Sequence, residues 1–312
     1  MTPKMPHALN LTDREFSMSF FHSLWLAAIL CGFTVTVQAE IVIRDDTGAT
    51  LRLPQPARRI VSLAPHITEN LFAAGAGERL VGAVDYSDFP EAAKRIPRVG
   101  GYSRPDLEAI VALKPDLVLT WQSGNSDAVV NTLKALGLTV YPSQLDRLED
   151  IPLNIEKLGR LAGTEAVAKP AAAAFRQRLG ALRKQYADRA SVPVFYQVWH
   201  RPLMTIGGGQ IISDVIRLCG GENVFAALPT KAPGVSVEAV LAVDPEAVVA
   251  SGMGRDAVVG LDDWRAWKRL KATARGNLFF VPSDLMQRPT PRLLEGAEIL
   301  CGHLETARGR RP

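Results

Sequence analysis

Short apolar runs alternate with amphipathic segments over residues 59–163. Runs of strand length occur at 59–65, 80–87, 116–121 and 139–144. Each is followed by a segment in which apolar residues recur at helical spacing. Strands that alternate with helices of about ten residues are typical of a parallel sheet with helices on both faces. The pattern therefore predicts an α/β lobe over 59–163.

Residues 164–190 break this alternation because they carry no strand signal. Apart from Pro170 and Gly180 they are good helix formers, and Thr164 is a candidate N-cap. They predict one long helix of about 25 residues, in which Pro170 could introduce a kink. The alternation resumes over 191–312. The chain is thus predicted to form two doubly wound α/β lobes joined by one backbone helix, with a ligand cleft between the lobes.

The first 39 residues follow a different pattern. An apolar run at 20–37 leads into Val-Gln-Ala, which is typical of a secretory signal peptide cleaved near Ala39. A retained membrane anchor is the alternative, because the run approaches the length that spans a bilayer. The sequence leaves open whether translation starts at Met1 or Met18.

Residues 40–58 are predicted to form an N-terminal extension with a short hairpin that turns at 45–48. After residue 40 no apolar run is long enough to span a membrane. We therefore expect an exported protein.

One sequence motif occurs in both predicted lobes. PDLEAIVALKPDLVLT at 105–120 is echoed by VSVEAVLAVDPEAVVAS at 235–251, and Glu108 aligns with Glu238. Both glutamates lie near the start of a predicted helix, where the helix dipole favours acidic side chains. Because each has the same place in its lobe, the pair could also present two matched acidic points to a two-fold partner with basic pockets. Both interpretations stay open on the sequence.

Aromatic and polar side chains gather where predicted strands end. In doubly wound sheets, ligands bind outside the carboxyl ends of the strands. The residues at or near those ends are Tyr86, Tyr102, Trp121, Trp199, Asp284 and Arg288. Flat apolar surfaces with a polar handle suit a large, planar, partly polar ligand, although any one aromatic could instead cap the core of its lobe. The set predicts a ligand site in the cleft.

Composition and charge argue against other classes of function. The chain is 47% hydrophobic and 22% charged, and its formal net charge of +4 comes without a long basic block. A nucleic-acid partner is therefore not supported. The sequence contains no Gly-x-Ser-x-Gly elbow, and His66 and Glu69 have the spacing of a metal-ligand pair without further ligands. We predict neither an enzyme nor a resident metal or cofactor.

Cys219 and Cys301 are the cysteines that remain after the leader. An even pair in an oxidising compartment favours one disulfide. The alternative is two separately buried thiols, because both residues end apolar helical patterns. Neither belongs to a CxxC motif, which argues against a redox or zinc site.

Several segments resemble the helical-backbone family of periplasmic substrate-binding proteins of ABC importers, in particular its cobalamin-binding members. The most specific segments are DYSDFP, LEAIVALKPDLVLTWQSGN, CGGENVF, VSVEAVL and SDLMQRPTPR. The resemblance implies a corrinoid as transported ligand, held between the lobes against Tyr86, Tyr102 and Trp121. It also implies that Asp284 and Arg288 face this ligand from the second lobe.

The resemblance implies three further properties. Glu108 and Glu238 would dock onto arginines of a permease dimer in the inner membrane. Cys219 and Cys301 would form a disulfide within the second lobe. The protein would act as a monomer in the periplasm.

The sequence departs from the cobalamin-binding pattern at two positions. Ala232 stands where a relative would have a ligand-contacting Trp, and Met204 where it would have Phe, so Trp199 is the candidate to replace the missing surface. The alternative ligand is haem or a ferric siderophore on the same scaffold. For haem, Tyr86, Tyr102, His66 or His200 could serve as the axial ligand.

Overall fold

The structure is a computed structural model that describes residues 1–3, 40–252 and 260–312. Residues Glu40–Pro312 form one compact unit. The signal peptide predicted over 1–39 lies outside the described residues from residue 4 onward. Within the described ranges, no helix has the length and apolar character needed to cross a membrane. The residue boundaries predicted for leader, extension, lobes and linking helix stay predictions.

Two parallel sheets of four strands each form the centres of the lobes. The first sheet contains β3 (Ile60–Ser62), β4 (Leu80–Ala83), β7 (Leu117–Trp121) and β8 (Val140–Ser143). The second contains β9 (Val192–Gln197), β12 (Gly221–Asn223), β13 (Ala247–Ala250) and β14 (Leu278–Phe280). The strand orders are β4-β3-β7-β8 and β12-β9-β13-β14. In both lobes the first strand along the chain therefore lies between the second and the third, which confirms the predicted pair of α/β lobes.

Helices cover both faces of the first sheet. One face packs against α2 (Pro65–Ala73) and α5 (Asp150–Ala162), the other against α3 (Leu107–Ala112) and α4 (Asp127–Ala135). Ile60 and Leu119 point to the first pair of helices, while Val61 and Val118 point to the second. This is the two-residue period of a strand buried on both sides, and it explains why the strands read as continuous apolar runs.

The second sheet is covered in the same way. The helices on one face are α7 (Ile211–Leu218) and α12 (Leu293–Gly309). The other face carries α8 (Val237–Val243), η3 (Asp263–Ala266) and α10 (Lys271–Ala274). The short α11 (Ser283–Met286) follows β14. The edge strand β12 is not among the predicted strands, because Gly-Glu-Asn contains no residue with a preference for strands.

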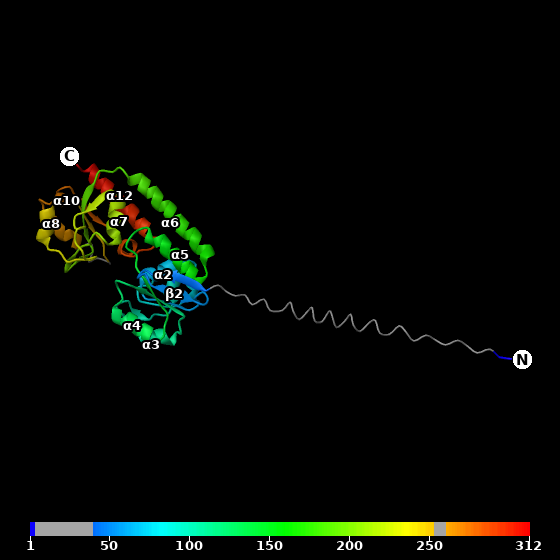
Figure 1. The fold of residues 1–312 in the computed structure, drawn as a ribbon. Helices are drawn as coiled ribbons and strands as arrows, with labels where there is room; N and C mark the ends of the chain where they lie inside the picture. Colours follow the sequence, from blue (N-terminus) through cyan, green and yellow to red (C-terminus); the bar gives the residue numbers. More distant parts are fainter. Residues whose placement is uncertain (4–39, 253–259) are drawn as a thin grey trace. The chain divides into compact units, whose positions relative to one another are not determined.

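The predicted backbone helix is α6 (Glu165–Tyr186), which has 22 residues and continues through Pro170. Figure 1 shows it running along both lobes. Its buried side chains, Phe175 and Leu179 among them, belong to a core cluster that also holds residues of both sheets. Thr164 is the N-cap residue of this helix as predicted, but its hydroxyl makes no capping hydrogen bond and donates to the carbonyl of Ala74 at 2.6 Å instead.

Three hairpins and two 3-10 turns complete the described fold. The predicted N-terminal hairpin is formed by β1 (Ile41–Arg44) and β2 (Thr50–Leu53). The other elements are β5 (Gly100–Gly101), β6 (Arg104–Pro105), β10 (Trp199–His200), β11 (Leu203–Met204), η1 (Gly77–Arg79) and η2 (Glu91–Arg95). The hairpins β5–β6 and β10–β11 were not predicted, and they hold Tyr102 and Trp199 in place.

Candidate ligand-binding site

A cavity of about 440 Å³ lies between the carboxyl ends of the two sheets. Its lining residues are Pro65, His66, Tyr86, Tyr102, Trp121, Trp199, Gly252, Ser283, Asp284, Gln287 and Arg288. They lie at or after the carboxyl ends of β3, β4 and β7 in the first lobe and of β9, β13 and β14 in the second. The order of the strands reverses at β3 and at β9, and such switch points are where doubly wound sheets bind ligands. The structure therefore brings all six predicted ligand-binding residues together.

The first lobe supplies most of the aromatic surface. Tyr86 is 64% exposed and Tyr102 43%, and the rings of Tyr102 and Trp121 lie with centroids 5.8 Å apart at an angle of 50°. Trp199 faces them from the second lobe and is 45% exposed. Tyr86 has a positive φ of 61°, a conformation that is uncommon outside glycine and that recurs at functional sites. Tyr86, Tyr102 and Trp199 are exposed, whereas Trp121 lines the cavity and also packs against the core.

Two residues that the sequence did not single out hold Trp121 in position. The amide of Asn125 donates to the carbonyl of Tyr102 at 2.7 Å, and its side-chain oxygen accepts from the backbone N–H of Trp121 at 2.6 Å. The Trp121 ring lies directly on Gly124, since a Cβ at that position would come within 1.8 Å of the ring. The polar turn after β7 therefore fixes the position of the Trp121 side chain.

His66 is a buried, neutral member of the cavity wall. Desolvation, assisted by the positive charge of Arg288, lowers the pKa of His66 to about 3. The imidazole meets Trp121 edge-on at 5.3 Å between centroids. Its Nε2 is buried and has no hydrogen-bond partner among the described residues. Glu69 does not share a metal site with it, because the Glu69 carboxylate pairs with Arg292.

The second lobe contributes the charged part of the wall. The guanidinium of Arg288 reaches Asp88 of the first lobe at 2.6 Å and Asp284 at 3.2 Å. Partial burial tends to raise the pKa of Asp88, but the hydrogen bond and the charge of Arg288 outweigh this effect and hold the pKa below its usual value. Asp88 and its bridge between the lobes were not predicted, although the residue lies within the DYSDFP segment.

A second ion pair joins the lobes. Arg292 binds Glu69 through two hydrogen bonds of 2.8 Å, and its guanidinium lies 3.8 Å from the centroid of the Phe89 ring. The amide of Asn70 donates to the carbonyl of Pro289 at 3.0 Å. Glu69 is 3% exposed, and a buried carboxylate needs such a partner. These contacts fix α2 against the segment that enters α12.

Glu108 and Glu238 occupy equivalent places in the two lobes. Each is the second residue of a short helix, α3 or α8, that leads into the third strand of its sheet. Each helix has a side-chain N-cap, Asp106 or Ser236. Backbone and Ser236 hydrogen bonds lower the pKa of Glu238. Both glutamates are exposed, and neither forms a salt bridge with another described residue.

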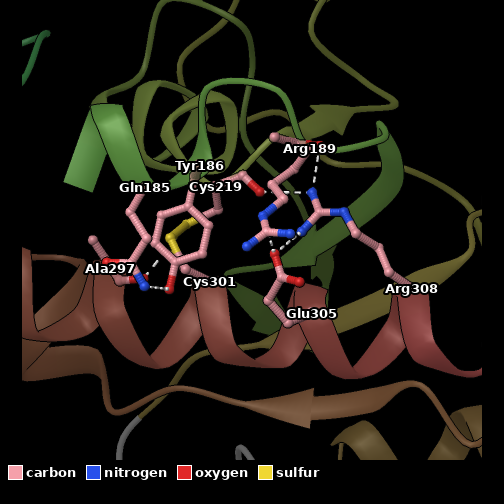
Figure 2. The surroundings of a disulfide bond; sticks show 9 residues. Gln185, Tyr186, Arg189, Cys219, Ala297, Cys301, Glu305 and Arg308 are labelled. Atoms are coloured by element: carbon pink, nitrogen blue, oxygen red, sulfur yellow. Dashed lines mark hydrogen bonds and ion pairs between the residues drawn. A yellow bond between two sulfur atoms is a disulfide. The ribbon is translucent and has the colours of Figure 1, made fainter. Parts of the chain in front are cut away.

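Cys219 and Cys301 form one disulfide, with their Cα atoms 4.7 Å apart. It joins the end of α7 to α12, and Figure 2 shows Tyr186 of α6 beside it. The guanidinium of Arg308 donates to the carbonyls of Cys219 and Gly220 at 2.8 and 2.9 Å. The predicted disulfide is confirmed, and the alternative of two separate thiols is wrong.

The two departures from the cobalamin-binding pattern have different outcomes. Met204 lies opposite Trp199 in the β10–β11 hairpin, so that hairpin still carries an aromatic side chain to the cavity. Ala232 is exposed and is not among the described residues that line the cavity.

Two lobes with parallel sheets, a shared cleft and a long backbone helix are the fold of substrate-binding proteins of the helical-backbone class. Residues 60–285 match the family model described as periplasmic binding protein, and the chain belongs to this family.

Known relatives of the chain include vitamin B12-binding proteins. The protein of that name from Vibrio cholerae is 40% identical over 262 residues, which cover 84% of this chain and 94% of the relative. The crystal structure of the periplasmic vitamin B12-binding protein BtuF of Vibrio cholerae covers 81% of this chain and 98% of its own, with a TM-score of 0.76. A periplasmic haem-binding protein from Pseudomonas aeruginosa is 26% identical, with a TM-score of 0.66 over 78% of this chain and 92% of its own.

Proposed function

We propose that this protein captures cobalamin or a related corrinoid in the cleft and delivers it to an ABC import permease. One observation carries the proposal: four aromatic side chains from two lobes line a single cavity at the switch points of both sheets. The relatives named vitamin B12-binding protein support the choice of ligand, because they share about two residues in five with this chain over most of their length.

The chemistry of the wall suits a large ring with polar substituents. The rings of Tyr86, Tyr102 and Trp121 offer flat apolar faces on which a macrocycle can pack. Asp284 and Arg288 on the opposite side can hydrogen-bond to amide groups at its rim. Because α6 packs into a core that contains residues of both sheets, we expect capture with small lobe movements rather than wide closure.

Haem or a ferric siderophore is the second candidate ligand. The resemblance to the Pseudomonas aeruginosa haem-binding protein favours it, and the unpartnered Nε2 of His66 and the hydroxyls of Tyr86 and Tyr102 are possible axial ligands. The charge of the wall disfavours it, since Arg288 is the only cation among the described cavity-lining residues and it is already paired.

Delivery requires a membrane partner, for which we propose Glu108 and Glu238 as docking points. Two exposed carboxylates at equivalent helix starts match a permease dimer that presents one basic pocket in each half. The proposal includes a periplasmic location after cleavage near Ala39, action as a monomer and no catalytic activity.

Titration of the mature protein, starting at Glu40, tests the ligand assignment. Cyanocobalamin, haemin and a ferric siderophore are added in turn, and binding is followed by tryptophan fluorescence and by calorimetry. Saturable heat with cyanocobalamin at a stoichiometry of one is the expected result. A saturable signal with haemin and none with cyanocobalamin would replace the corrinoid by haem as the ligand.

A further inference from the structure

Few charged side chains line the cavity. Among the described lining residues only Asp284 and Arg288 carry a charge. His66 is neutral at physiological pH because its pKa is lowered to about 3. Arg292, the nearest further cation along the chain, is bound to Glu69 through both oxygens of the carboxylate. Arg288 is therefore the group that an anionic ligand would have to use.

Arg288 is not available as a free cation. Its side chain is 13% exposed, its Nη1 reaches Asp88 at 2.6 Å and its Nη2 reaches Asp284 at 3.2 Å. The two carboxylates come from different lobes, and together they exceed the charge of the single guanidinium by one unit. Asp88 itself does not line the cavity, so its role at the site is exerted through Arg288.

This arrangement has a consequence for ligand choice. A ligand that carries carboxylates would meet a cluster of Arg288, Asp284 and Asp88 with a net charge of −1, and it would have to compete with both carboxylates for the guanidinium. A ligand that carries amides can donate to the free oxygen of Asp284, which lines the cavity, and needs no counter-charge. Charge of the wrong sign in a partly desolvated cleft is a strong discriminator between ligands of the same shape.

We propose that Asp88 is a specificity-determining residue that neutralises Arg288 and thereby selects an amide-bearing corrin over an anionic tetrapyrrole. The inference rests on the proposed corrinoid-binding function and assigns the selectivity of that site to a carboxylate of the opposite lobe. Asp88 is a positioning residue, because it contacts Arg288 and not the cavity.

Two corrinoids with the same ring and different rim charge isolate this effect. Dicyanocobinamide carries amides where dicyanocobyrinic acid carries carboxylates. The affinity of each is measured by calorimetry at pH 7.5 for the wild type and for Asp88→Asn, which keeps the shape of the side chain and removes its charge. Glu91→Gln is the matched control, since it removes one negative charge from the same segment at an exposed residue that pairs with Lys94.

We expect the wild type to prefer the amide form, and we expect Asp88→Asn to reduce this preference by roughly tenfold or more. The change should come mainly from tighter binding of the acid, and Glu91→Gln should leave the preference as it is. Asp88→Glu should restore the wild-type preference. A general loosening of the contact between the two lobes would weaken the binding of both ligands alike and would leave the ratio of their affinities unchanged.

An unchanged ratio in Asp88→Asn overturns the inference while the proposed function stands. Asp284→Asn provides a second measurement if Asp88→Asn does not fold, because it removes the other carboxylate from the same guanidinium and should shift the ratio in the same direction. A wild type that binds the acid as tightly as the amide also overturns the inference. A wild type that binds neither corrinoid and binds haemin refutes the proposed function itself.

Discussion

The two lobes share a topology and differ in the chemistry that they bring to the cleft. Both have the same strand order, and in both a short helix with an exposed glutamate as its second residue leads into the third strand. The first lobe presents Tyr86, Tyr102 and Trp121, whereas the second presents Trp199 beside charged and polar side chains. The topology thus sets the place of the site, and the residues just after the strands set what it can bind.

The two lobes also differ in the links that stabilise each of them internally. The second lobe contains the disulfide, which closes a loop with a sequence separation of 82 residues. The first lobe is extended by the N-terminal hairpin, which is fixed to α5 by the ion pair between Asp46 and Lys157 at 2.6 Å. A covalent link is thus confined to one lobe among the described residues, and the lobes should respond differently to reduction.

Charge reversal of the two glutamates tests the likeness of the lobes and has the largest expected effect. Glu108→Arg and Glu238→Arg, together or singly, should abolish or strongly reduce uptake of labelled cyanocobalamin by cells that depend on this protein. Ligand affinity measured by calorimetry should not change, because both residues lie outside the cavity lining. Glu91→Arg is the control. Loss of ligand binding in the variants would mean that the glutamates are not docking points.

Removal of the disulfide tests the difference in stability. Cys219→Ala combined with Cys301→Ala should lower the free energy of unfolding by about 4 kcal/mol, because the link constrains a long loop in the unfolded chain. Urea unfolding with and without reductant measures the change. Reductant should destabilise the wild type and leave the double variant unaffected, and equal sensitivity of both proteins would contradict the assignment.

Truncation of the aromatic side chains tests whether the first lobe contributes more of the aromatic contacts to the ligand than the second. Trp121→Ala should weaken cyanocobalamin binding by about 100-fold, as expected for a central aromatic contact. Trp199→Ala should weaken it by roughly tenfold, since this ring is one aromatic on a mostly polar side. Trp267→Ala, at an exposed residue that does not line this cavity, should bind normally in calorimetry. Unchanged affinity in Trp121→Ala would remove this residue from the site.

The pH dependence of stability tests the buried imidazole of the first lobe and has the smallest expected effect. The pKa of His66 falls from 6.5 to about 3 on folding, so the unfolded chain binds a proton that the folded chain does not. This contribution is complete above pH 6.5 and is lost as the pH falls from 6.5 towards 3. We expect a loss of about 2 kcal/mol between pH 7.5 and 5.

Urea unfolding of the wild type and of His66→Gln at both pH values measures this contribution. The variant should lose less stability on acidification, because glutamine does not titrate. If both proteins lose the same free energy of unfolding, His66 is protonated in the folded state at pH 5, and the cavity wall carries a positive charge at this residue.

Much of the site was predictable because strand ends can be read from the sequence. Trp121 ends an apolar run, and the carboxyl ends of parallel strands meet at one edge of a sheet. His66 also follows a strand, but its spacing to Glu69 was too weak a signal to predict a site, and only the packed structure shows Glu69 bound to Arg292. The bridge from Arg288 to Asp88 joins residues 200 positions apart, and no local pattern carries information about such a pair.

The two α/β lobes, the linking helix and the set of strand-end residues could be predicted from the amino-acid sequence, because strand and helix periods and turn residues are local properties of the chain. The relative placement of the two lobes, the ion pairs of Arg288 and the burial of His66 became known only from the folded chain. These features depend on desolvation and on contacts between distant segments, and neither exists until both lobes pack on their common core.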